Sequence, residues 1–128
     1  HLVNRTVSKA EAIAAAIGQC FPAVEVVIGF PKGEVDLVLN ATSLGLRADD
    51  PLPLDTSAFP LGQARAVYDM IYQPIETPLL AAAAAAGCKT ANGLGMLLHQ
   101  GAQSLEIWTG QTAPIEVMRA ALKEAVHD

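Results

Sequence analysis

The fold is decided by the stretch Leu2-Val3-Asn4-Arg5-Thr6-Val7-Ser8-Lys9, a short apolar strand that ends in polar and basic residues and enters a helix. Further strands, with helices among them, follow it to the end of the chain. The strands are apolar almost throughout, which is typical of a parallel sheet covered by helices on both faces. We expect strands at residues 2–4, 24–28, 35–39, 66–70 and 89–92, and helices at residues 8–18, 78–86, 93–108 and 114–126.

The composition is that of one globular domain. The chain has 128 residues, of which 52% are hydrophobic and 16% charged, and its net charge is −5. These values argue against a disordered chain and against a nucleic-acid partner. The longest apolar run, residues 78–87, is too short to span a bilayer, so no membrane partner is expected. Two distant cysteines, Cys20 and Cys88, suit free thiols in a reducing cytoplasm better than a disulfide framework or a metal site.

The end of the first strand carries the most specific chemical signal. Ligands of open α/β sheets bind beyond the carboxyl ends of the strands, and NAD-dependent enzymes usually place a carboxylate at the second strand to bind the ribose. We compare the chain's first strand with that second strand of the fold. At its end this chain has Asn4, Arg5 and Thr6, with Lys9 one helical turn further on. A guanidinium group pairs with a 2′-phosphate, which a carboxylate would repel. The segment therefore predicts an NADP site, and the alternative is a solvated polar strand end.

Later strand ends offer further candidates. Thr42, in Asn40-Ala41-Thr42-Ser43, could approach a dinucleotide, and Met70 offers a soft surface for a nicotinamide ring. Tyr72 could donate to a substrate oxygen, Gly93 permits close approach of the backbone to a ligand, and Gln100 could bind a hydroxyl. The alternative at each position is an ordinary turn or packing role. The sequence reveals no metal cluster, no nucleophile triad and no Lys–Asp acid/base pair.

In this order and spacing, the strand ends resemble those of the shikimate dehydrogenase family. The resemblance covers essentially the whole chain. It rests on Asn4-Arg5-Thr6-Val7-Ser8-Lys9, Asn40-Ala41-Thr42-Ser43, Tyr68-Asp69-Met70-Ile71-Tyr72 with Pro74 and Thr77-Pro78-Leu79-Leu80, Asn92-Gly93-Leu94-Gly95-Met96-Leu97 with Gln100, and Glu106-Ile107-Trp108-Thr109-Gly110.

The resemblance implies an enzyme that reduces 3-dehydroshikimate to shikimate with NADPH. It places the 2′-phosphate and adenine ribose on residues at the first strand end, the nicotinamide on three later residues, and the substrate on two more. The residues for the 2′-phosphate and ribose are Asn4, Arg5, Thr6, Val7, Ser8 and Lys9. Those for the nicotinamide are Thr42, Met70 and Gly93, and those for the substrate are Tyr72 and Gln100.

The resemblance also implies what this chain lacks. In the family, a preceding substrate domain supplies the catalytic Lys and Asp, and a glycine-rich turn follows the first strand of the nucleotide domain. The chain begins at that domain's second strand, so we expect an α/β fold with a partial doubly wound (Rossmann-like) parallel sheet. Residues 1–92 would form this domain, and residues 93–128 helices that return towards the substrate domain. The missing first strand is central in the order 3-2-1-4-5-6. We therefore expect exposed strand edges, a need for the N-terminal portion as partner, and no stable monomer without it.

Two other functions remain open. A quinate/shikimate dehydrogenase of the same family would oxidise a related acid, often with NAD, although the basic strand end favours NADP. A non-catalytic nucleotide-binding fragment is the second alternative, because the chain itself carries no acid/base group. The resemblance also leaves open that the protein forms a homodimer.

Overall fold

Three parallel strands and four α-helices make up the computed structural model, which describes residues 1–47 and 49–127. Their bounds are α1 Val7–Cys20, β1 Val35–Asn40, a 3-10 helix Leu61–Gln63, β2 Ala64–Asp69, α2 Pro78–Ala85, β3 Lys89–Asn92, α3 Leu94–Thr109 and α4 Ile115–His127. The sheet order is β1-β2-β3, and all pairs are parallel. The α/β class, the parallel sheet and the last three expected strands are thus confirmed.

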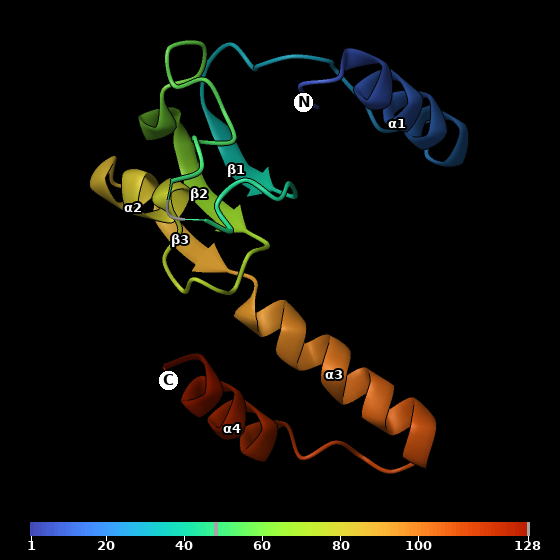
Figure 1. The fold of residues 1–128 in the computed structure, drawn as a ribbon. Coiled ribbons are helices and arrows are strands. Elements are labelled where there is room, and N and C mark those ends of the chain that lie inside the picture. Colours follow the sequence, from blue (N-terminus) through green and yellow to red (C-terminus); the bar gives the residue numbers. More distant parts are fainter. Residues whose placement is uncertain (48, 128) are drawn as a thin grey trace.

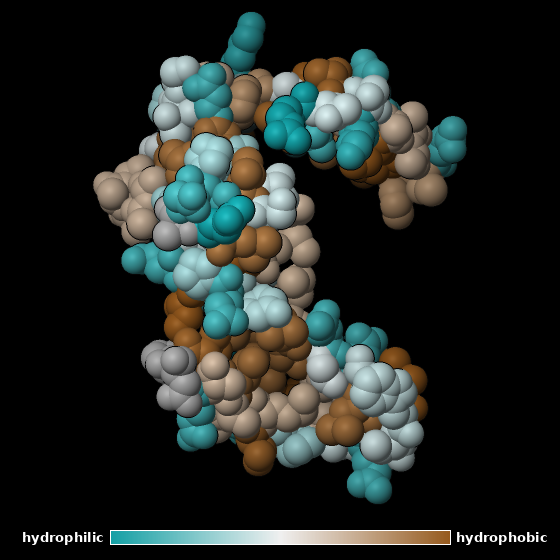
Figure 2. All heavy atoms as spheres, viewed as in Figure 1, coloured by the Kyte–Doolittle hydropathy of each residue, from teal (hydrophilic) through white to brown (hydrophobic). Residues whose placement is uncertain are grey.

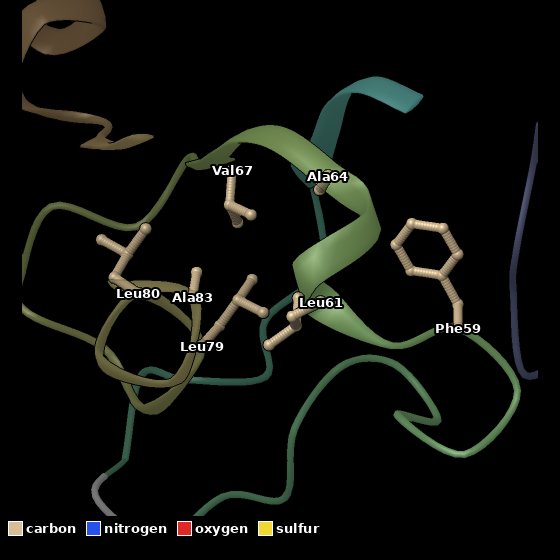
Figure 3. Close-up of a cluster of buried hydrophobic side chains, with 7 residues drawn as sticks. All are labelled: Phe59, Leu61, Ala64, Val67, Leu79, Leu80 and Ala83. Carbon is tan, nitrogen blue, oxygen red and sulfur yellow. The ribbon is translucent and has the colours of Figure 1, made fainter. Parts of the chain in front are cut away.

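One face of the sheet packs on helix α2. Thr77 begins this helix: its hydroxyl oxygen accepts from the N–H of Leu80 at 3.3 Å, and Pro78 occupies the first turn. Figure 3 shows the core that results, in which side chains of α2 meet those of β2 and the segment before it. Its buried members are Phe59, Leu61, Ala64, Val67, Leu79, Leu80 and Ala83. The small alanines let the helix lie close to the strands.

The other face of the sheet and the outer edge of β1 are open. Leu37 and Leu39 project from the face opposite Val38, and they are 55% and 53% exposed. Val38 packs against the core under α2 instead. In Figure 1, α1 lies away from the sheet on one side, and α3 and α4 extend from the other. The space-filling view has the outline of an open arc, with an open gap between α1 and the α3–α4 pair (Figure 2).

The two strands expected at residues 2–4 and 24–28 are wrong as full strands. They contribute a single parallel bridge between Leu2 and Ile28. Leu2 donates to the carbonyl of Val27 at 2.8 Å, and Gly29 donates to the carbonyl of Leu2 at 2.9 Å. A pair of strands with no neighbour on either side is marginal in water. The pairing therefore stops after one bridge.

The helices agree with the expected positions to within a few residues. α1 begins one residue earlier than expected and runs through Gly18 to Cys20. α3 ends at Thr109, and Gly110 caps it in the left-handed conformation, at φ 69°. No helix in the described ranges is long and apolar enough to cross a lipid bilayer.

Candidate functional site

A hollow lies at the carboxyl ends of β1 and β2. It has a volume of about 430 Å³, and its walls come from the segments that follow the two strands. Its lining residues are Ala41, Thr42, Leu46, Met70, Ile71, Tyr72 and Gln73. Three of the candidates from the sequence, Thr42, Met70 and Tyr72, are therefore brought together. This is the edge at which open α/β sheets bind ligands.

A buried polar network connects the two walls of this hollow. Asn40 and Asp69 are register partners at the last positions of β1 and β2, and the Asn40 Nδ2 donates to the Asp69 Oδ1 at 3.0 Å. The Thr77 hydroxyl donates to the Asp69 Oδ2 at 2.7 Å, which ties the start of α2 to the same carboxylate. Sequence reasoning assigned no role to Asn40 or Asp69. Their only sequence signal is a polar side chain at the end of each of two apolar strands.

Gly93 packs against the backbone of Met70, which lines the hollow. The N–H of Gly93 donates to the carbonyl of Ile71 at 3.0 Å, and Gly93 itself is buried. A Cβ atom at this position would lie 1.9 Å from the carbonyl oxygen of Met70. The close approach that requires glycine here is therefore to the backbone of the neighbouring strand end.

The basic segment lies at a second hollow, of about 370 Å³. Val3, Asn4 and Arg5 line it together with Phe30 and residues 52–55. Thr6 is the N-cap of α1 and donates its N–H to the Asn4 Oδ1 at 2.9 Å, while Val7, Ser8 and Lys9 form the exposed first turn. Among the described residues, the side chains of Arg5 and Lys9 have no hydrogen-bond or ion-pair partner. Both cations are available to an external anion.

The two hollows share no lining residue, so the candidates of the basic segment are not brought together with Thr42 and Met70. Within residues 1–47 and 49–127, the Leu2 segment pairs through a single bridge, and β1 is an edge strand. Gln100 lies about two turns into α3 and is exposed, and it does not line the first hollow.

Local hydrogen bonds lower the pKa of two aspartates. Hydrogen bonds from the backbone N–H groups of Gly45 and Arg47 lower the pKa of Asp50. The Ser57 hydroxyl, at 2.6 Å, and its N–H lower the pKa of Asp55. Asp55 lines the second hollow, so this hollow holds one fixed negative charge besides the cation of Arg5. Across residues 1–47 and 49–127, no cluster of His, Cys, Asp and Glu could hold a metal ion.

Known proteins resemble this chain along nearly its whole length. A family model described as the shikimate 5'-dehydrogenase C-terminal domain matches residues 93–123. The shikimate dehydrogenase (NADP(+)) of Nitrobacter hamburgensis is 43% identical over 126 residues, which is 98% of this chain and 44% of the relative.

Solved structures agree with this match. A shikimate dehydrogenase in complex with NADP+ superimposes with a TM-score of 0.80 at 36% identity, covering 97% of this chain and 45% of that one. Quinate dehydrogenase from Corynebacterium glutamicum, in complex with NAD, has a TM-score of 0.78 at 31% identity, with 95% and 45% covered. The chain thus spans about half the length of the relatives it matches.

Proposed function

Because the chain belongs to the shikimate dehydrogenase family, as the counterpart of the C-terminal half of its members, we propose that it is the cofactor-binding part of an enzyme that reduces 3-dehydroshikimate to shikimate with NADPH. The observation that carries the proposal is the hollow that unites Thr42, Met70 and Tyr72 at the ligand-binding edge of the sheet. Its mixture of a soft apolar surface with two hydroxyls fits a nicotinamide ring beside a polyhydroxylated substrate.

The candidate residues at the first strand end and at the first hollow fit NADP, and Asp55 is the one carboxylate that lies near Arg5 in the second hollow. Thr42, Met70 and Gly93 would hold the nicotinamide side, and Asn4, Arg5, Thr6, Val7, Ser8 and Lys9 the adenine ribose and its 2′-phosphate. Among the described residues, the side chains of Arg5 and Lys9 are unpaired, and the backbone N–H groups of Val7 and Ser8 at the start of α1 have no partner, which favours an anion. NADPH, when bound, supplies the hydride.

Tyr72 and Gln100 would bind the substrate. Tyr72 is partly exposed in the first hollow, where its hydroxyl can donate to a carboxylate or ring hydroxyl. Gln100 lies on the helix that continues from Gly93, and its amide can donate and accept. The catalytic Lys and Asp would lie in a portion that precedes this chain. A positioned acid/base of this kind supplies the proton that accompanies hydride transfer.

That preceding portion would also complete the sheet. β1 has an unpaired outer edge, Leu37 and Leu39 leave its open face apolar, and relatives are about twice as long as this chain. A strand placed between β1 and the Leu2 segment would pair with both and bring the two hollows to one edge. We propose that residues 1–92 belong to this nucleotide domain, and that the helices of residues 93–128 return towards a substrate domain. A cytoplasmic location is part of the same proposal.

The proposal is tested by steady-state assay of the polypeptide as its gene encodes it. Shikimate and quinate are each offered with NADP+ and with NAD+, and shikimate with NADP+ is expected to give the highest kcat/KM. The similarity to a quinate dehydrogenase makes quinate with NAD+ the specific second candidate. A higher kcat/KM for quinate with NAD+ would refute the proposal and favour a quinate dehydrogenase. Binding of NADP+ without turnover would favour the non-catalytic nucleotide-binding fragment.

Arg5→Ala is expected to weaken NADP+ binding roughly 10- to 100-fold and to leave NAD+ binding nearly unchanged. Charge-assisted hydrogen bonds contribute about 1.5–3 kcal/mol, and NAD+ lacks the 2′-phosphate that would accept them. The measurement is the dissociation constant of each dinucleotide. Arg65→Ala is the matched control, because Arg65 pairs at 3.0 Å with Asp36 and both side chains are largely exposed. Equal losses for NADP+ and NAD+ would contradict a phosphate contact.

A further inference from the structure

The side-chain amide of Asn40 can adopt only one orientation. Its Nδ2 lies 3.0 Å from the carbonyl oxygen of Leu44 and 3.0 Å from the Asp69 Oδ1, while its Oδ1 lies 3.0 Å from the backbone nitrogen of Thr42. A carbonyl oxygen cannot donate, and a backbone N–H cannot accept. Exchanging the two ends of the amide would therefore put acceptor against acceptor and donor against donor in a buried position.

Asp69 reinforces this orientation from the other side. Its side chain is 0% exposed, and its Oδ1 also accepts from the N–H of Ile71 at 3.1 Å. Its Oδ2 accepts from the Thr77 hydroxyl at 2.7 Å. Both carboxylate oxygens therefore act as acceptors, and the group that Asn40 presents to Asp69 must be the donor.

The fixed amide in turn fixes the hydroxyl of Thr42. The Thr42 Oγ1 lies 2.8 Å from the Asn40 Oδ1, which has only lone pairs, so the hydroxyl hydrogen must point there. The same Oγ1 accepts from the N–H of Leu44 at 3.1 Å. A hydroxyl has one hydrogen and two lone pairs. One lone pair and no hydrogen therefore remain for a ligand in the hollow, where Thr42 is exposed.

We propose that Thr42 is a specificity residue that acts only as an acceptor, and that it recognises an N–H donor on the ligand. Asn40 and Asp69 are positioning residues, because they set the direction of the Thr42 hydroxyl without reaching the hollow themselves. The inference rests on the proposed function, under which the donor is the carboxamide NH2 of the nicotinamide ring.

The test compares the binding of NADP+ with that of its 3-acetylpyridine analogue, in which a methyl group replaces the carboxamide NH2. Dissociation constants of both are measured by calorimetry for the natural polypeptide and for Thr42→Val and Thr42→Ser. The natural polypeptide is expected to prefer NADP+, since a site built to accept from an N–H rejects an analogue that lacks it. Thr42→Val should reduce this preference by about tenfold, the value of one lost hydrogen bond, and Thr42→Ser should preserve it.

The ratio of the two dissociation constants separates recognition from loosening of the loop. Loss of the Asn40 and Leu44 contacts in Thr42→Val would weaken both ligands equally and leave the ratio unchanged, and that result would overturn the proposal. Failure of Thr42→Ser to preserve the ratio would also overturn it. Turnover is not part of the readout, so a polypeptide that binds NADP+ but does not oxidise shikimate would refute the proposed function and not this inference.

Discussion

Replacing Gly93 with alanine is expected to destabilise the protein by about 3 kcal/mol or more and to weaken ligand binding at the first hollow. The added Cβ would lie 1.9 Å from the carbonyl oxygen of Met70 and 2.6 Å from its carbonyl carbon. Those are backbone atoms, so no side chain can rotate away to relieve the overlap. Gly93 has an ordinary φ of −72°, so the effect comes from lack of space and not from backbone conformation.

Gly95→Ala is the matched control. Gly95 lies in the first turn of the same helix, and a Cβ there would meet nothing within 4 Å. Alanine has a helix propensity about 1 kcal/mol better than glycine, so this variant should be neutral or slightly more stable. Urea unfolding of the natural polypeptide and of both variants measures the difference. Equal stability of the two variants would contradict the packing of Gly93 against the end of β2.

The same displacement should reach the hollow. The N–H of Gly93 is bonded to the carbonyl of Ile71, and Met70, Ile71 and Tyr72 all line the hollow. Moving this segment away from Gly93 changes the spacing of Met70 and Tyr72 from Thr42. Any Gly93→Ala protein that does fold is therefore expected to bind NADP+ more weakly, whereas Gly95→Ala binds it normally.

Strand pattern was sufficient to predict the sheet but not the network at its edge. The apolar runs at β1, β2 and β3 predicted three parallel strands, and Thr77-Pro78 predicted the start of α2, because these are local signals. The bond from Asn40 to Asp69 depends on strand register, which brings together residues 29 positions apart. No local pattern contains that information. For Gly93, the sequence predicted a close approach of the backbone but not the partner, because Met70 follows β2 in a different part of the chain.

The first two expected strands do not form for a different reason. Their sequences have the pattern of a strand, but the adjoining strand of the sheet is not part of this chain. Val27 and Ile28 have the β-branched side chains of a strand, but they are 39% and 42% exposed, and in the described part of the chain their segment pairs only through the bridge to Leu2. In a sheet of order 3-2-1-4-5-6, the strand that would complete the pairing lies between the Leu2 segment and β1. A high β-propensity therefore does not produce a hydrogen-bonded strand when the adjoining strand is not present.

The 128-residue chain, made by itself, is therefore expected to unfold without a sharp cooperative transition and to bind NADP+ only weakly. Among the described residues, the edge of β1 is unpaired, the face that carries Leu37 and Leu39 is uncovered, and α1 packs on no strand of the sheet to any substantial extent. An open apolar edge of this kind also favours association between copies of the chain. Urea unfolding followed by circular dichroism, together with calorimetry of NADP+ binding, gives the two measurements.

The matched comparison is a chimaera in which the N-terminal portion of the Nitrobacter hamburgensis relative precedes this chain, since the two proteins are 43% identical where they align. The chimaera is expected to unfold cooperatively and to bind NADP+, because the added portion supplies a strand for β1 and a cover for its open face. It also brings Arg5 and Thr42 to one edge, so binding should depend on both residues, as neither hollow alone holds the whole dinucleotide. A single sharp transition with equally tight NADP+ binding in the isolated chain would contradict this account. The open edge would then be a stable feature of the fold, and the two hollows would act without a strand between them.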